Sequence, residues 1–63
     1  MQNNIIISDF IPGTLVRCPS QPDWGVGQIQ SCIRNKATIN FENSGKKVID
    51  LTIIHIEILE NAD

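Results

Sequence analysis

The chain has 63 residues, with seven acidic and five basic side chains and a formal net charge of −2 at pH 7. A chain this short buries only about 60% of the surface that its unfolded form exposes, so it predicts one small domain with a limited core. Hydrophobic residues make up 41% of the sequence, and the most frequent of them is isoleucine, which suits a pleated, half-buried surface. The composition favours an all-β domain. Its acidic balance makes nucleic acid a less favoured partner than protein.

The sequence predicts a cytoplasmic protein with no membrane partner. It contains no apolar run of about 18 residues, the length that a transmembrane helix requires. The first four residues carry no positive charge, and the Ile5–Ile7 run is too short for the apolar region of a signal peptide.

Turn-forming residues recur at short intervals and divide the chain into short strands. Residues 1–11 form an N-terminal segment in which Ile5–Ile7 either adds a strand or lies over the end of the domain. The first strand is expected over 14–18 and ends at Pro19, which cannot donate to a ladder. The second is expected over 26–33, with Gln28 and Gln30 on one face. The other face of this strand then carries Gly27, Ile29, Ser31 and Ile33.

The next two strands are also short and are bounded by turn-forming residues. Arg34-Asn35 predicts a tight hairpin turn in which Asn35 adopts a positive φ. A third strand over 36–42 is expected to point Ala37, Ile39 and Phe41 inward. A second hairpin, at Asn43-Ser44-Gly45, leads into a fourth strand over 46–50.

The last part of the chain completes the expected fold. Residues 51–53 are predicted to form a short helical turn before a strand over 54–59. This strand would bury Ile54, Ile56 and Ile58 and point His55 and Glu57 outward. Five short antiparallel strands joined by tight turns predict a small SH3-like (Tudor-like) barrel over residues 12–60, followed by a polar tail over 61–63.

Four segments carry a resemblance to a known family. They are Gly13 to Val16 with Pro19, Trp24 to Ser31, Ile39 to Glu42, and Gly45 to Ile49. In this order, residues 12–59 resemble the bacterial family called domain of unknown function 3553. More distantly, they are similar to the Tudor-like barrels of CarD-type transcription regulators and to the C-terminal barrel of UvrD-type helicases. Those barrels bind RNA polymerase, so the resemblance implies a role beside the transcription or DNA-repair machinery.

The chain departs from the family pattern in two places. Cys18 precedes Pro19 where a histidine is expected, and the Arg34-Asn35 turn lacks a glycine. The resemblance therefore does not carry over to this chain any family chemistry that would depend on histidine at the first position.

No set of residues has the spacing of a catalytic or metal-binding motif. His55 is the only histidine, and the sequence forces no Ser, Cys or carboxylate beside it, so we expect a solvated side chain and no enzyme. Cys18 and Cys32 lack the Cys-x-x-Cys spacing of zinc sites. The predicted register places them several residue pairs apart, so we expect two reduced thiols rather than a disulfide. Neither a metal ion nor a cofactor is expected.

The most distinctive segment is Trp24-Gly25-Val26-Gly27. Two glycines can form a phosphate-binding loop, but such loops lead into a helix, whereas an alternating strand follows here. We therefore expect Gly25 and Gly27 to allow a bulge or a close approach of the backbone. Trp24 is the only tryptophan, and a cage for a methylated ligand would need more aromatic residues than the chain has.

The expected strand ends place Arg17, Trp24 and Lys46 on one rim of the barrel. We predict that the chain is a protein-interaction module that binds its partner at this rim, with Trp24 at the centre. Two alternatives stay open: Trp24 stacks a nucleic-acid base, or it only caps the barrel.

Two other surfaces are weaker candidates. Arg34 and Lys36 are expected roughly 20 Å from Lys46 and Lys47, at the other end of the third strand, so these cations do not form one stripe. An exposed strand edge can also accept a strand from a partner. The side chains beside such an edge would be Gln28 and Gln30, or Thr38, Asn40 and Glu42. The oligomeric state is not predicted.

Overall fold

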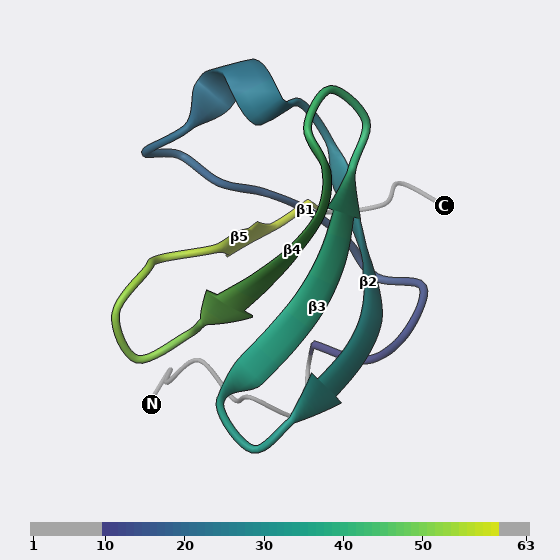
Figure 1. The fold of residues 1–63 in the computed structure, drawn as a ribbon, viewed down its shortest axis with the longest axis vertical. Coiled ribbons are helices and arrows are strands. Elements are labelled where there is room, and N and C mark those ends of the chain that lie inside the picture. The colour runs from purple at the N-terminus through teal and green to yellow at the C-terminus, as the bar shows by residue number, and fades with distance from the viewer. Residues whose placement is uncertain (1–9, 60–63) are drawn as a thin grey trace.

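A computed structural model describes residues 10–59 as a single antiparallel sheet with one short 3-10 helix. The elements are β1 (Leu15–Arg17), η2 (Pro22–Trp24), β2 (Gly27–Ile33), β3 (Lys36–Phe41), β4 (Gly45–Asp50) and β5 (Glu57–Ile58). The strand order is β4-β3-β2-β1-β5 (Figure 1). An all-β fold with five antiparallel strands is thereby confirmed. The sheet is not closed, because β4 and β5 are its two ends. The Ile5–Ile7 segment, for which a further strand was one of two alternatives, and the tail at 61–63 lie outside the described residues.

The middle strands agree with the prediction within one residue at each end, and the last one does not. β5 has only two residues, so the prediction of a strand over 54–59 was wrong for residues 54–56. The reason is that the carbonyl oxygen of Asp50 accepts hydrogen bonds from the N–H groups of Ile53 and Ile54, both at 3.0 Å. These bonds turn the chain after β4, and Ile53 is left 76% exposed.

A β-bulge changes which side chains of β2 face inward. Ile29 pairs with Ile39 and Ser31 pairs with Thr38, so Gln30 is an extra residue on the β2 side. The bulge shifts the alternation by one, because side chains on a strand change face with every residue. Ser31 and Ile33 therefore lie on the outer face of the sheet, and Ile33 is 68% exposed. The expectation that these two residues share a face with Gly27 and Ile29 was wrong.

One apolar cluster lies against the inner face of the sheet. Its buried members are Phe10, Val16, Cys18, Ile29, Ala37, Ile39, Phe41, Ile49 and Ile56. The inward residues predicted for the third strand are all among them, and so is Ile56. Ile54 is half-buried and Ile58 is 37% exposed, so the expected burial of these two is not met. Phe10, which precedes the range predicted for the barrel, is 3% exposed and belongs to the core.

The β2–β3 turn also differs from the expectation in one respect. Arg34, not Asn35, has the positive φ, at 57°. Asn35 already follows the register of β3, because its carbonyl oxygen accepts the N–H of Leu51 at 2.8 Å. Arg34 is therefore the residue of this turn that adopts the left-handed conformation.

The turn after β4 is held by the side chain of Asp50. Its Oδ1 accepts a hydrogen bond from the hydroxyl of Thr52 at 2.6 Å and another from the Thr52 N–H at 2.9 Å. These two bonds, with a smaller electrostatic effect of Lys36, lower the pKa of Asp50 below its ordinary value of 3.8.

We predict that Thr52→Val raises the pKa of Asp50 towards its ordinary value, because the hydroxyl bond is the largest cause of the depression. The pKa is lower in the folded protein than in the unfolded chain. The associated stabilisation is therefore present above the unfolded pKa and is lost as pH falls through the folded one. An NMR titration of the Asp50 carboxyl group in both proteins measures the shift, and urea unfolding below pH 4 measures its effect on stability. Identical titration curves for the two proteins would contradict the assignment.

Candidate functional site

The segment from η2 to β2 is fastened to the turn between β3 and β4. The N–H groups of Glu42 and Asn43 donate to the carbonyl oxygens of Val26 and Trp24, at 2.8 and 3.0 Å. In return, the Val26 N–H donates to Oε2 of Glu42 at 3.1 Å, and the Asn43 side-chain amide donates to the carbonyl of Asp23 at 3.2 Å. Both segments lie at the same end of the sheet (Figure 1). The loop over 22–26 is therefore held in one conformation by side chains and backbone together.

The two glycines let these segments approach closely. Gly25 has φ 79° and ψ −162°, a region essentially restricted to glycine. A Cβ on Gly25 would lie 2.6 Å from Cγ of Glu42, and one on Gly27 would lie 2.6 Å from Ile39 and 2.7 Å from the ring of Phe41. Gly27 is the first residue of β2, so a strand rather than a helix follows Gly25. The geometry thus favours the predicted role of the two glycines, which is to let the backbone pass close to neighbouring residues, over a phosphate-binding loop.

Trp24 lies at the border of the core. Its ring is 5.0 Å from the ring of Phe41 between centroids, with a tilt of 56°. Nζ of Lys47 lies over the indole, 5.0 Å from its centroid. Trp24 is half-buried, so one part of the ring closes the core and another part reaches the surface.

The structure does not bring the three predicted rim residues together. Lys46 pairs with Asn40 on the outer face of the sheet, whereas Lys47 pairs with Ile39 on the inner face. The cation beside Trp24 is therefore Lys47 rather than the predicted Lys46. Two adjacent lysines on a strand always point to opposite faces, and nothing in their own chemistry shows which one points inward.

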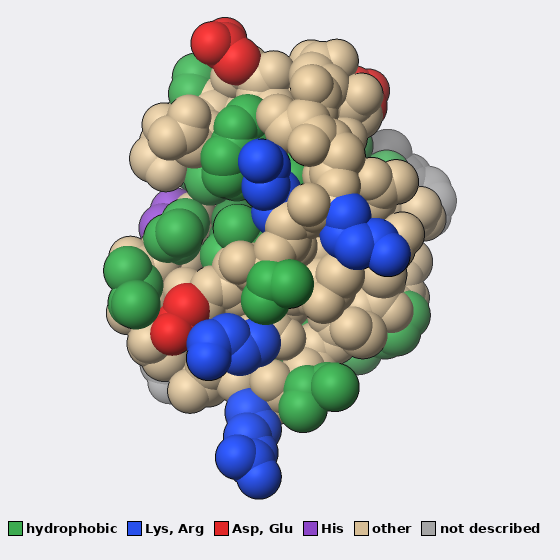
Figure 2. Space-filling model, viewed as in Figure 1, with side chains coloured by type: hydrophobic (Ala, Val, Ile, Leu, Met, Phe, Trp, Pro, Cys, Tyr) green, Lys and Arg blue, Asp and Glu red, His purple; other side chains and the backbone are tan. Residues whose placement is uncertain are grey.

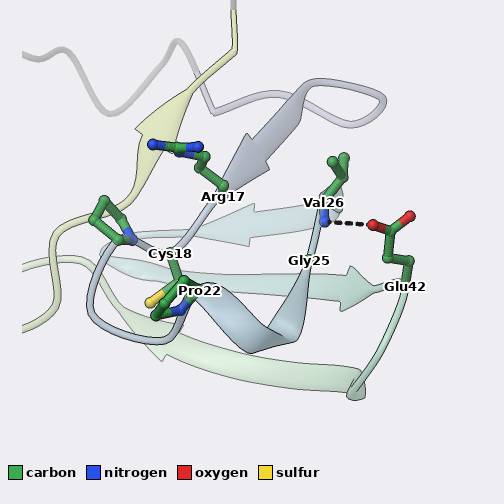
Figure 3. Close-up of a pocket in the computed structure, with 7 residues that line it drawn as sticks. Arg17, Cys18, Pro22, Gly25, Val26 and Glu42 are labelled. Atoms are coloured by element: carbon green, nitrogen blue, oxygen red, sulfur yellow. Dashed lines mark hydrogen bonds between the residues drawn. The ribbon is translucent and has the colours of Figure 1, made fainter.

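Arg17 contributes to a different feature, a pocket of about 240 Å³ beside η2. The pocket is lined by Arg17, Cys18, Pro19, Pro22, Gly25, Val26 and Glu42. Figure 3 shows Arg17 and Glu42 on opposite sides of it, with the carboxylate of Glu42 joined to the Val26 N–H. The two prolines and Val26, which is 38% exposed, give it apolar walls, and the buried thiol of Cys18 borders it. Trp24 and Lys46 do not line this pocket.

Sequence reasoning found only part of this pocket. The missing residues come from two separate segments, namely the loop between β1 and β2 and the residue that directly follows β3, Glu42. The two prolines between the first and second strands were the available signal, because they shape a loop that follows one fixed path. The contribution of Glu42 could not be found, since it depends on the close approach at Gly25.

His55 is exposed, and its neighbour Glu57 forms an ion pair with Arg17, with 3.0 Å between Oε1 and Nε. Residues 10–59 contain no group of three or more His, Cys, Asp or Glu side chains that could hold a metal ion. Cys18 and Cys32 are both free thiols. Within the described range, no helix is long and apolar enough to cross a membrane.

Basic side chains gather over β3 and β4. Figure 2 shows Lys and Arg side chains along this face, with hydrophobic side chains between them. Lys36 and Lys46 both lie on the outer face of the sheet, separated by the Thr38–Val48 pair. All five basic residues but only four of the seven acidic ones fall within residues 10–59. The described part of the chain is therefore less acidic than the whole chain.

A sequence comparison identifies the family. The pattern of a family described as a protein of unknown function, DUF3553, matches residues 10–59. The chain belongs to this family. No curated protein and no solved structure matches it. The part of the chain that matches DUF3553 is the part that the structure describes, so it includes the sheet, the pocket and Trp24.

We predict that Gly25→Ala destabilises this DUF3553 chain more than Gly45→Ala does. Both residues have a positive φ, but a Cβ at Gly45 would meet nothing within 4 Å. The Gly45 variant should lose about 1–2 kcal/mol of unfolding free energy from the left-handed conformation alone. The Gly25 variant should lose about 2–4 kcal/mol, because overpacking against Glu42 adds to the backbone strain. Urea unfolding of the two variants measures the difference, and equal losses would show that the contact with Glu42 is unimportant.

Proposed function

We propose that this DUF3553 domain is a cytoplasmic, non-enzymatic protein-interaction module with an SH3-like (Tudor-like) architecture. Its partner in this proposal is a component of the transcription or DNA-repair machinery, such as RNA polymerase. The observation that carries the proposal is the pocket beside η2, which is bounded by a loop already fixed in place.

The size and lining of the pocket favour a protein partner over a small molecule. Sites for drug-sized ligands and cofactors usually occupy about 300–1,000 Å³, whereas this pocket has about 240 Å³. That volume suits one large side chain of a partner. Apolar walls with Arg17 on one side and Glu42 on the other match an apolar side chain with polar neighbours.

The fixed loop supports the same conclusion energetically. Association costs roughly 0.5–1.5 kcal/mol for each flexible side chain that must be ordered, and more for a flexible loop. Here the loop over 22–26 is already held by Glu42 and Asn43. The domain therefore loses little conformational freedom when a partner binds.

The fold and the resemblance support the finer assignment. The first strand lies between β2 and β5, a short 3-10 helix follows it, and the sheet is curled (Figure 1). These features are compatible with a small SH3-like barrel. The similarity to the barrels of CarD-type regulators and UvrD-type helicases suggests the class of partner.

In this proposal the predicted site residues have distinct roles. Arg17 contacts the partner from the edge of the pocket, and its ion pair with Glu57 orients it. Trp24 offers the exposed part of its ring beside Lys47. Lys46 contributes charge from the outer face of the sheet.

We predict that Val26→Lys lowers recovery of protein partners from a native lysate at least about fivefold, the effect expected of a central contact residue. The long charged side chain would fill the pocket, while the backbone groups of Val26 could still bond to Glu42. Partners are captured on the immobilised domain and quantified by mass spectrometry, with nuclease treatment to remove contacts through nucleic acid. Ile53→Lys is the matched control, because Ile53 is also exposed and apolar but does not line the pocket. Equal recovery by both variants would contradict a binding role for the pocket.

The basic face over β3 and β4 supports a second candidate, a nucleic-acid-binding barrel that stacks a base on Trp24 (Figure 2). It ranks lower because Lys47 already lies over the indole and would have to move away. If the protein-binding proposal is right, single-stranded oligonucleotides at about 50 mM salt should cause no saturable quenching of Trp24 fluorescence. Saturable quenching that weakens steeply with salt would instead favour the nucleic-acid candidate.

A further inference from the structure

The outer edge of β4 is free among the described residues. Strand β4 lies at one end of the sheet, and β3 is its only partner within residues 10–59. An unpaired strand edge presents N–H and C=O groups that can bond to another strand. The sequence and register of β4 together show which strand would fit.

The register identifies the backbone groups at this edge. The Leu51 N–H donates to the Asn35 carbonyl at 2.8 Å and so continues the β3–β4 pairing. Hydrogen-bonded pairs alternate along an antiparallel ladder, so the groups of Lys47 and Ile49 also point towards β3.

The groups of Lys46, Val48 and Asp50 consequently point away from β3. One of them confirms this direction, because the Asp50 carbonyl bonds to the turn that follows β4 instead of to β3. The edge thus offers both backbone groups of Lys46 and Val48 and the N–H of Asp50.

The side chains of the same three residues form a symmetric pattern on the outer face. Lys46 and Asp50 carry opposite charges and lie two residues on either side of Val48. Val48 is apolar and 65% exposed. A second copy of β4, related by a two-fold axis that lies beside Val48 and perpendicular to the sheet, would place its Asp50 opposite Lys46 and its Lys46 opposite Asp50.

We propose that two copies of this chain associate through β4, antiparallel and centred on Val48. Val48 then pairs with the partner's Val48, and Lys46 pairs with the partner's Asp50 at both ends. Directly opposite residues share a face of the sheet, so the two valines would be in contact and both ion pairs would form on the same side. The two sheets would become one continuous sheet with a two-fold axis.

The charges select this arrangement over its alternatives. A parallel pairing in register would place Lys46 opposite the partner's Lys46. Antiparallel pairings centred on Lys46 or Asp50 would also place like charges opposite each other, which is destabilising in a sheet. A lysine on an edge usually discourages pairing with other strands. Here the carboxylate of a second copy compensates its charge.

The association is expected to be weak. A single added strand gives an interface below about 1,200 Å², the size of transient contacts. The Asp50 carbonyl is already bonded to Ile53 and Ile54, so the ladder forms without it. We therefore expect a dissociation constant of about 0.1–1 mM.

Charge exchange tests the proposal directly. Lys46→Asp places acidic residues at both ends of the edge, and Asp50→Lys places basic residues there. Each variant alone should dimerise at least about tenfold more weakly, because two attractive pairs become repulsive. A mixture of the two should recover association at the wild-type level, since every pair is again of opposite charge. Sedimentation equilibrium of the full chain measures this over about 0.05–2 mM, a range around the expected dissociation constant.

Two controls separate pairing from other effects. Arg34→Asp changes the net charge as Lys46→Asp does, but it lies in the β2–β3 turn and should associate like the wild type. Asp50→Lys also removes the bonds to Thr52, so circular dichroism must show that it is folded. If it does not fold, Val48→Pro replaces it. That variant removes an outward N–H without breaking a bond to β3, and it should abolish association.

Amide hydrogen exchange identifies what occupies the edge. The Lys46 and Val48 amides should exchange fast in dilute protein and become protected as concentration rises, whereas Lys47 and Ile49 stay protected throughout. Protection of Lys46 and Val48 that does not depend on concentration would mean that another part of the same chain covers the edge. That result would overturn the proposal. So would a wild-type chain that is monomeric at 2 mM, about twenty times the lower estimate of the dissociation constant. A mixture of the two charge variants that fails to associate would overturn it as well.

Discussion

The structure depends on two positions where there is no room for a side chain. At Gly25 and Gly27 the chain passes so close to Ile39, Phe41 and Glu42 that a single methyl group would overlap them. Overpacking of this kind usually costs about 1–3 kcal/mol, a large share of the stability of so small a domain. The close approach is what joins the loop after β1 to the far end of β3.

The features of the candidate site follow from this contact. With no side chain at Gly25, the carboxylate of Glu42 reaches the Val26 N–H, and Asn43 reaches the backbone of η2. The fixed loop in turn places the indole of Trp24 against the ring of Phe41, and Pro22, Gly25 and Val26 of the same loop line the pocket. Trp24 is thus part of the packing around the core, and it does not line the pocket.

The sequence predicted the strands better than it predicted the site. Alternation in Ala37, Ile39 and Phe41 was sufficient to place β3 and its inward face, because no irregularity interrupts that strand. The same reasoning failed in β2, where Ile29 and Ile33 were assigned to one face although the register changes at Gln30, between them. The failure at the site had a related cause. Which of two adjacent lysines meets Trp24, and which carboxylate borders the pocket, depend on contacts between segments distant in sequence.

The bulge in β2 affects the curvature of the sheet but not the pairing of its strands or the packing of its core. Residues 31–33 pair with 38–36 as they would if Gln30 were absent and Ile29 were followed directly by Ser31. Removing this one exposed residue would therefore leave every other pair of β2 and β3 in register and every side chain on its present face. What would change is the local bend and twist that the extra residue gives the strand. Gln30 thus affects the bend of the sheet while taking almost no part in its core. The curvature of this small domain can therefore be altered by removing one residue at this position.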